Sequence, residues 1–191
     1  MPKQKITKEM VVDTAFQLAR EGGMERVLVK EIAARLGCSV QPIYSCCRNM
    51  DGLRRDVYAR VRRFVGERLS QEQYGPESFQ AVGRACLQLA KEEPQLFKLF
   101  ILCPREGVSG LEDLCREASD PRLDEAIAGE LGLDGERARR LHINMIVYTV
   151  GLGAIFSTAV PGIPAEDIFP WQEGAYQAFL AQIKEEMRNG S

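Results

Sequence analysis

The spacing of apolar residues predicts two short helices joined by a tight turn between Val29 and Tyr44. In the first helix the apolar positions recur about one turn apart, at Val29, Ile32, Ala33 and Leu36. One face of that helix is therefore expected to be buried. Gly37 follows the last apolar position, and glycine adopts the left-handed conformation that ends many helices without a Cβ clash. The pattern predicts a buried helix that stops at Gly37.

The second helix of the pair is expected to begin after Ser39. The Ser39 hydroxyl is expected to accept a hydrogen bond from the backbone N–H of Gln41, because Pro42 has no N–H to offer. Ile43 has the spacing that anchors this helix in the core. Four residues are left facing outward at the front of the helix: Val40, Gln41, Pro42 and Tyr44. This arrangement is typical of a helix-turn-helix, whose second helix enters the DNA major groove, although an ordinary helical hairpin has the same spacing.

Helical spacing continues along the rest of the chain, so the sequence predicts an all-α fold. Thr7 is expected to cap a first helix that ends at Gly22 and Gly23. A long helix is predicted from about Asp51 to Gln71. The remaining helices are predicted at residues 78–92, at 96–102, from Ser109, from Pro121 to Gly132, at about 135–160, and around Trp171 to Met187.

An uncharged stretch from Ile143 to Val160 reaches the lower length limit for a membrane span. Polar residues lie within it, including Asn144, Thr149 and Ser157, and a buried helix explains the stretch equally well. The first eight residues are polar and basic with no apolar segment behind them, so no secretory signal is expected. We therefore expect a cytoplasmic protein without membrane contact, whose six cysteines are reduced thiols.

Charge is distributed unevenly along the chain, although the net charge is only −2. Residues 1–63 contain 13 Lys and Arg against 7 Asp and Glu, which gives +6. Residues 64–191 contain 12 against 20, which gives −8. The basic third coincides with the predicted helix-turn-helix, so this asymmetry indicates a polyanion-binding head on an acidic body.

One third of the chain carries a family resemblance. Its specific parts are the first helix closing in AREGG, the run KEIAARLGCS, and the Ile43-Tyr44 pair followed by a short link into a long helix. With these features, residues 6–57 resemble the DNA-binding domain of the tetracycline-repressor (TetR) family of bacterial transcription regulators. The resemblance implies a helix-turn-helix domain over residues 1–50 and a helical effector-binding and dimerisation domain over residues 51–191. It also implies a homodimer that binds a near-palindromic operator in double-stranded DNA.

The predicted DNA-binding residues are Lys30, Ser39, Val40, Gln41, Pro42, Tyr44 and Arg48. The resemblance assigns Tyr44 to a phosphate contact through its hydroxyl, and Lys30 can contact the same backbone. Gln41 is the one side chain at the front of the helix that can bind a base edge bidentately, preferably adenine. Two positions depart from the family pattern, because Leu28 stands where threonine is usual and Met50 where lysine is common.

Two further sets of residues are predicted for the body. An effector pocket among the middle helices would be lined by aromatic, sulfur-containing and polar side chains: Phe64, Cys86, Phe97, Phe100, Cys103, His142, Met145 and Tyr148. Such a stripe is also typical of a plain core. The last two long helices resemble the family's dimer interface, with the predicted contacts Gly151, Ala154, Thr158, Tyr176, Phe179, Leu180 and Ile183. Internal packing within one protomer is the alternative.

The function predicted from these features is a DNA-binding repressor released by a small apolar or amphipathic ligand. An alternative within the same architecture is a regulator that senses thiol oxidation or a metal through its cysteines, among which Cys46 and Cys47 are adjacent. A helical cysteine-dependent enzyme is a more remote alternative. The sequence contains no recognisable catalytic triad, phosphate-binding loop or metal motif, so no catalytic residue, metal or cofactor is predicted.

Overall fold

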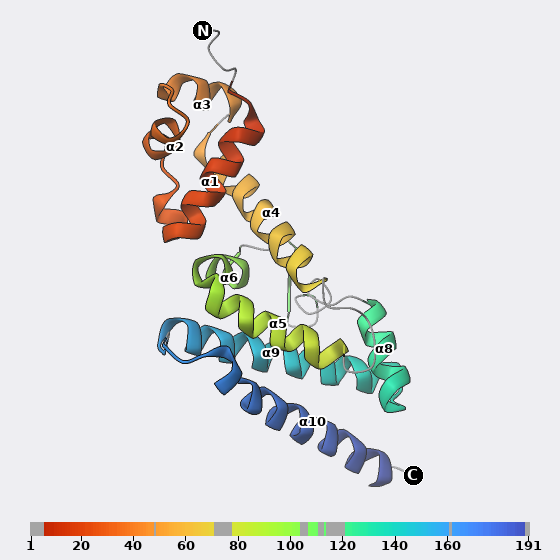
Figure 1. The fold of residues 1–191 in the computed structure, drawn as a ribbon. Helices are drawn as coiled ribbons and strands as arrows, with labels where there is room; N and C mark the ends of the chain where they lie inside the picture. The colour runs from red at the N-terminus through yellow and green to blue at the C-terminus, as the bar shows by residue number, and fades with distance from the viewer. Residues whose placement is uncertain are drawn as a thin grey trace. The chain divides into compact units, whose positions relative to one another are not determined.

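The computed structural model describes residues 6–47, 49–70, 78–103, 107–110, 113, 121–160 and 162–189. Within these residues the regular structure is entirely helical, which confirms the predicted all-α fold (Figure 1). In chain order the elements are α1 (Lys8–Gly22), η1 (Met24–Arg26), α2 (Val29–Arg35), α3 (Val40–Cys46), α4 (Met50–Leu69), α5 (Ser78–Glu92), α6 (Pro94–Ile101), α8 (Pro121–Leu131), α9 (Gly135–Thr158), η2 (Ala165–Asp167) and α10 (Phe169–Asn189).

The chain forms two compact units. The first unit comprises Met1–Glu67 and Glu93–Cys103, and the second comprises Arg68–Glu92 and Pro104–Ser191. The first unit thus extends beyond residue 50, because most of α4 and all of α6 pack with the N-terminal helices. The functional division at residue 50 stays a prediction, whereas the compact units describe packing alone.

Helix α1 is the central support of the first unit. The Thr7 hydroxyl accepts a hydrogen bond from the backbone N–H of Met10 at 3.2 Å, as expected for a cap. Gly23 ends the helix with φ of +81°, a conformation that favours glycine. The buried side of α1 faces the neighbouring helices with Val11, Ala15, Phe16, Leu18 and Ala19. Helix α1 contacts α2, α3 and α6.

The predicted helix-turn-helix is present as α2 and α3. Ile32, Ala33 and Ile43 are buried, and Gly37 has φ of +62° in the turn between the two helices. Ser39 occupies the N-cap position of α3 with extended backbone, but its side chain makes no capping hydrogen bond. The predicted bond from the Gln41 N–H to the Ser39 hydroxyl is therefore wrong. Capping side chains bond the second or third helical N–H, and here the third position is proline, which removes one of the two donors.

Side chains connect α1 to α4 along the length of both helices. Lys8 pairs with Asp56 at 2.7 Å, and Asp13 lies 3.5 Å from Arg60. Further along, the Phe16 and Phe64 rings lie 5.7 Å apart, and the Arg60 guanidinium stacks over the Phe16 ring. Helix α4 also buries one apolar stripe, formed by Leu53, Val57, Val61 and Val65. The stripe agrees with the predicted periodicity and explains why α4 belongs to the first unit up to Glu67.

The second unit is built around α9, which contacts α5, α8 and α10. By length and mean hydropathy α9 is the one described helix that would suffice to cross a membrane. Eight of its residues are buried in the protein, however, as in the core helix of a globular domain. Apolar residues of α8, α9 and α10 form one cluster, in which Leu141 and Ile127 are almost fully buried. The predicted core-helix interpretation agrees with this packing.

Two polar pairs lie inside the second unit. The Gln172 side-chain amide donates to the Thr149 hydroxyl at 3.1 Å, and both residues are buried. The His142 Nδ1 lies 2.5 Å from the Asp124 carboxylate, which joins α9 to α8. Gly83 on α5 allows Gln172 to approach, since a Cβ at residue 83 would overlap the Gln172 amide nitrogen. These partners satisfy polar groups that would otherwise destabilise the core.

We predict that Gly83→Ala destabilises the protein. To admit the new methyl group, Gln172 must give up its bond to Thr149, at a cost of roughly 1–3 kcal/mol in the free energy of unfolding. Better helix propensity offsets only about 1 kcal/mol of that. Urea denaturation followed by circular dichroism measures the change.

Gly66→Ala is the matched control, because a Cβ at residue 66 of α4 meets no atom within 4 Å. This variant should be more stable than the unaltered protein by about 0.5–1 kcal/mol. In a protein that already carries Gln172→Ala, the overlapping side chain is gone. Adding Gly83→Ala to that variant should therefore increase its stability by the helix-propensity gain. Equal stability of the two single glycine variants would contradict the proposed overlap.

The two helix caps lead to a second prediction. Thr7→Ala removes an observed capping bond and should lower the free energy of unfolding by about 1 kcal/mol. Ser39→Ala removes a hydroxyl without such a bond and should change stability by less than about 0.5 kcal/mol. Thermal unfolding of the two variants under identical conditions compares them. A loss at Ser39 as large as that at Thr7 would show that the Ser39 hydroxyl does cap α3.

Candidate nucleic-acid interface

The front of α3 presents an exposed set of side chains, as predicted. Val40 is 40% exposed and Tyr44 is 52% exposed, so both side chains are accessible to a binding partner. Gln41 is exposed and Pro42 is half-buried, whereas Ile43 at 1% exposure anchors the opposite side in the core. One short helix therefore holds apolar, amide and aromatic groups on a single outward face.

The hydroxyl groups of this helix differ in what they bond. Ser45 donates its hydroxyl hydrogen to the Gln41 carbonyl of its own helix at 3.1 Å. Ser39, at the exposed start of the helix, makes no capping bond. An external acceptor or donor can therefore bond the Ser39 hydroxyl without breaking a cap. Arg48, the last of the predicted DNA-binding residues, lies outside the described residues.

Ion pairs within the first unit neutralise much of its positive charge. Carboxylates pair with several of its basic residues: Lys8 with Asp56, Arg20 with Glu93, Arg26 with Glu31, Arg35 with Glu21, Arg54 with Asp51, and Arg60 with Asp13. Among the described residues of the first unit, Lys30, Arg55 and Lys98 are exposed and form no ion pair, and exposed Arg62 donates to the Cys103 sulfur instead of a carboxylate. Lys30 thus keeps the uncompensated charge that a phosphate contact requires. The pairing pattern distinguishes Arg55 from its neighbour Arg54, which pairs with Asp51.

Leu28, at the N-cap of α2, is 51% exposed and provides no side-chain cap. The family that the sequence resembles usually has threonine here, whereas this chain presents an exposed apolar side chain two residues before Lys30. Any contact that a threonine hydroxyl makes at this position is absent, because leucine has no donor or acceptor.

The adjacent cysteines at the end of α3 differ in how far they are shielded from solvent. Cys47 is buried, and burial raises the pKa of its thiol. Cys46 is half-buried and donates to the Ile6 carbonyl at 3.5 Å. In the second unit, burial raises the pKa of the Cys86 thiol to about 12. A raised pKa keeps the thiol protonated at neutral pH, which makes it a poor nucleophile and metal ligand. The described part of the chain contains no cluster of three His, Cys, Asp or Glu residues that could hold a metal.

The predicted effector residues are divided between the two compact units. The first unit contains Phe64, Phe97, Phe100 and Cys103, and the second contains Cys86, His142, Met145 and Tyr148. His142 is occupied by Asp124 and by the edge of the Phe79 ring. Within the second unit a shallow hollow of about 360 Å³ is lined by Tyr148, Pro170, Trp171, Gly174 and Ala175. Only Tyr148 is common to both sets, so the effector site stays a prediction.

Three of the predicted dimer contacts belong to the core of their own unit. Tyr176, Leu180 and Ile183 are at most 8% exposed and pack in the cluster formed with α8 and α9. Their stripe on α10 faces inward, a direction that helical periodicity alone cannot supply. On α9, Gly151 and Thr158 are exposed, whereas Ala154, and Phe179 on α10, are half-buried. Large apolar side chains also remain exposed on these helices: Val147, Ile155 and Trp171.

Comparisons with known proteins match the chain through its fold. No family model and no curated protein matches by sequence. A crystal structure of a TetR-like transcriptional regulator from Rhodococcus sp. RHA1 superposes with a TM-score of 0.61 at 16% identity, covering 95% of this chain and 99% of that one. A second transcriptional regulator from the same organism has a TM-score of 0.54 at 16% identity, with coverages of 94% and 97%. The chain therefore has the fold of TetR-like transcriptional regulators along nearly its whole length.

Proposed function

We propose that the protein is a sequence-specific DNA-binding transcriptional regulator of the TetR family that acts as a homodimer in the cytoplasm. The observation that carries this proposal is the exposed front of α3, held by buried Ile43 at the surface of a unit with a TetR-like fold. The basic charge of residues 1–63 supports the same partner, because a polyanion attracts such a surface. The regulator needs no cofactor or metal for this role.

The residues of α3 and α2 divide the recognition of DNA between them. Gln41 reads a base edge, with adenine as the preferred partner, and Val40 and Pro42 contact thymine methyl groups. Tyr44 and Lys30 bond backbone phosphates, which sets affinity and orientation without reading sequence. Ser39 adds a hydroxyl contact at the start of the helix, and Arg48 adds positive charge after its end.

A homodimer provides two such helices for one operator. Two recognition helices then enter successive major grooves of a near-palindromic site, with their centres about 34 Å apart. The exposed surface of α9 and α10 supports this assembly, because Val147, Ile155 and Trp171 are left uncovered in one protomer. Apolar side chains of this size gain free energy when a partner covers them. Which residues form the dimer interface is likewise a proposal.

The regulator acts as a repressor that a small apolar or amphipathic ligand releases. Such a ligand releases DNA only if it binds more tightly to an arrangement of the protein that does not fit the operator. The hollow in the second unit supports this class of ligand, because the residues that line it, Tyr148, Pro170, Trp171, Gly174 and Ala175, carry no charge. A thiol-responsive regulator is less well supported, since the raised thiol pKa of Cys47 and Cys86 keeps both thiols protonated.

The proposed function is tested by selecting duplexes from a random DNA library with the unaltered protein. We expect enrichment of one inverted repeat whose half-sites are centred about one helical turn apart. Analytical ultracentrifugation of the protein with the winning duplex should give one or two dimers for each site. Failure to enrich any sequence at low salt, with protein that is folded by circular dichroism, would contradict the proposed function.

Gln41 and Tyr44 separate base reading from backbone binding. Gln41→Ala should change the base preferred at one position of each half-site and cost about 1–3 kcal/mol of binding on the original operator. Tyr44→Phe should weaken binding to all duplexes by a similar factor, because it removes a phosphate bond. Competition binding on the selected operator and its single-base variants measures both effects. If Gln41→Ala lowered affinity without altering base preference, another residue would read that base.

A further inference from the structure

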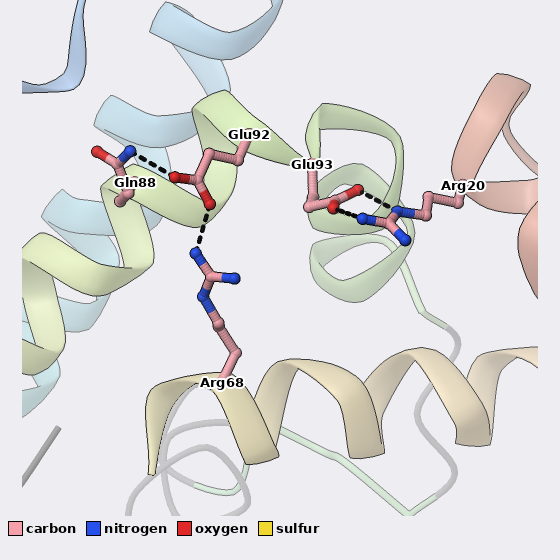
Figure 2. A network of polar contacts seen from close by, with 5 residues as sticks. All are labelled: Arg20, Arg68, Gln88, Glu92 and Glu93. Carbon is pink, nitrogen blue, oxygen red and sulfur yellow. Dashed lines mark hydrogen bonds and ion pairs between the residues drawn. The ribbon is translucent and has the colours of Figure 1, made fainter. Parts of the chain in front are cut away.

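Helix α6 lies in the same compact unit as the helix-turn-helix and is joined to α1 by an arginine–glutamate pair. The Arg20 Nε donates to Glu93 Oε2 at 2.8 Å, and Arg20 Nη2 donates to the other carboxylate oxygen (Figure 2). The Glu93 side chain is only 12% exposed, whereas that of Arg20 is 42% exposed. A bidentate pair with one nearly buried carboxylate is both directional and strong.

The position of Glu93 shows that its side chain serves this pair and not its own helix. Glu93 is the N-cap residue of α6, but its carboxylate bonds no backbone N–H of that helix. Pro94 follows at the first helical position and has no N–H to donate. The start of α6 approaches the end of α1 closely, since a Cβ at Gly23 would lie 3.3 Å from the Gln95 side-chain oxygen. Packing and the ion pair therefore hold the start of α6 against the end of α1.

The same end of α1 is also joined to the helix-turn-helix. Glu21, the residue after Arg20, accepts hydrogen bonds from both terminal nitrogens of the Arg35 guanidinium on α2, with Arg35 Nη1 2.6 Å from Glu21 Oε1. Arg20 also stacks over the Phe64 ring of α4, with 5.9 Å between the guanidinium carbon and the ring centre. Two adjacent side chains on α1 thus connect α6 on one side with α2 on the other.

Glu92, the neighbour of Glu93, provides an internal comparison. Its carboxylate pairs with Arg68 and accepts from the Gln88 amide at 2.6 Å, within the second unit (Figure 2). The two glutamates are adjacent and chemically identical, and each pairs with one arginine. Glu93 is bonded to α1, whereas the Arg68 partner of Glu92 lies at the end of α4 that belongs to the second unit.

We propose that Arg20 and Glu93 are positioning residues for DNA binding. Glu93 at the start of α6 holds Arg20 at the end of α1, and Glu21 and Arg35 extend this connection to α2. The front of α3 then meets DNA in the orientation that α1 and α2 impose, so α6 is a structural part of the DNA-binding unit. This inference rests on the proposed function.

Glu93→Gln in the full-length protein tests the proposal, with Glu92→Gln as the matched control. Glu93→Gln should weaken binding to the library-selected duplex about fivefold and leave the salt dependence of binding unchanged. The direction of this change in DNA affinity is informative, because electrostatics alone would predict stronger binding when a negative charge is removed from a basic unit. Amide hydrogen exchange without DNA should be faster in α1 and α2 and unchanged in α10. Glu92→Gln should alter neither DNA affinity nor exchange in α2.

Exchanging the two charges provides a rescue. The double variant Arg20→Glu with Glu93→Arg keeps the net charge and should recover most of the affinity that either single change removes. Unaltered DNA affinity and α2 exchange in Glu93→Gln, equal effects of Glu92→Gln and Glu93→Gln, or no recovery in the exchanged variant would each overturn the proposal. If the unaltered protein binds no duplex, the proposed function fails. The hydrogen-exchange comparison needs no DNA, so faster exchange of α2 in Glu93→Gln would still show whether Glu93 holds the helix-turn-helix.

Discussion

The burial of α1 is the constraint on which the first unit depends. Four of its side chains, Val11, Ala15, Leu18 and Ala19, have no exposed surface. They are covered on several sides, because α1 contacts α2, α3 and α6 and shares side-chain contacts with α4. Close packing of this kind transmits displacement, since protein cores contain little empty space. The orientation of α3 is therefore determined by the helices around α1 as much as by its own short sequence.

Ion pairs determine which positive charges of the first unit remain available to contact phosphate. A net charge of +6 over residues 1–63 describes attraction to a polyanion at a distance. Contact with a phosphate additionally requires a cation that is not already bound to a carboxylate. Arg35 and Arg20 use their guanidinium groups to join helices, whereas the positive charges of exposed Lys30 and Arg55 have no carboxylate partner. The same residue type thus has a structural role at one position and a candidate binding role at another.

The second unit combines an apolar cluster with a few buried polar groups whose partners are specific. Gln172 bonds Thr149 between α10 and α9, and His142 meets Asp124 between α9 and α8. Leaving such a group without a partner in the core would cost roughly 1–3 kcal/mol, so these pairs favour one register of the helices over others. Gly83 belongs to this arrangement, because it makes room for the Gln172 amide. An apolar cluster alone would tolerate more sliding between helices.

The sequence by itself determined the local features of this protein. The helices, the turn at Gly37, the cap at Thr7 and the burial of Ile43 follow from residue spacing and from the backbone preferences of single residues, which act over a few positions. Tertiary structure decided which charges are paired, that Ser39 does not cap α3, and that Tyr176, Leu180 and Ile183 face the core of their own unit. It also decided that Glu93 joins α6 to α1. Such contacts depend on which residues meet across long stretches of chain, and helical periodicity defines a face of a helix without specifying its partner.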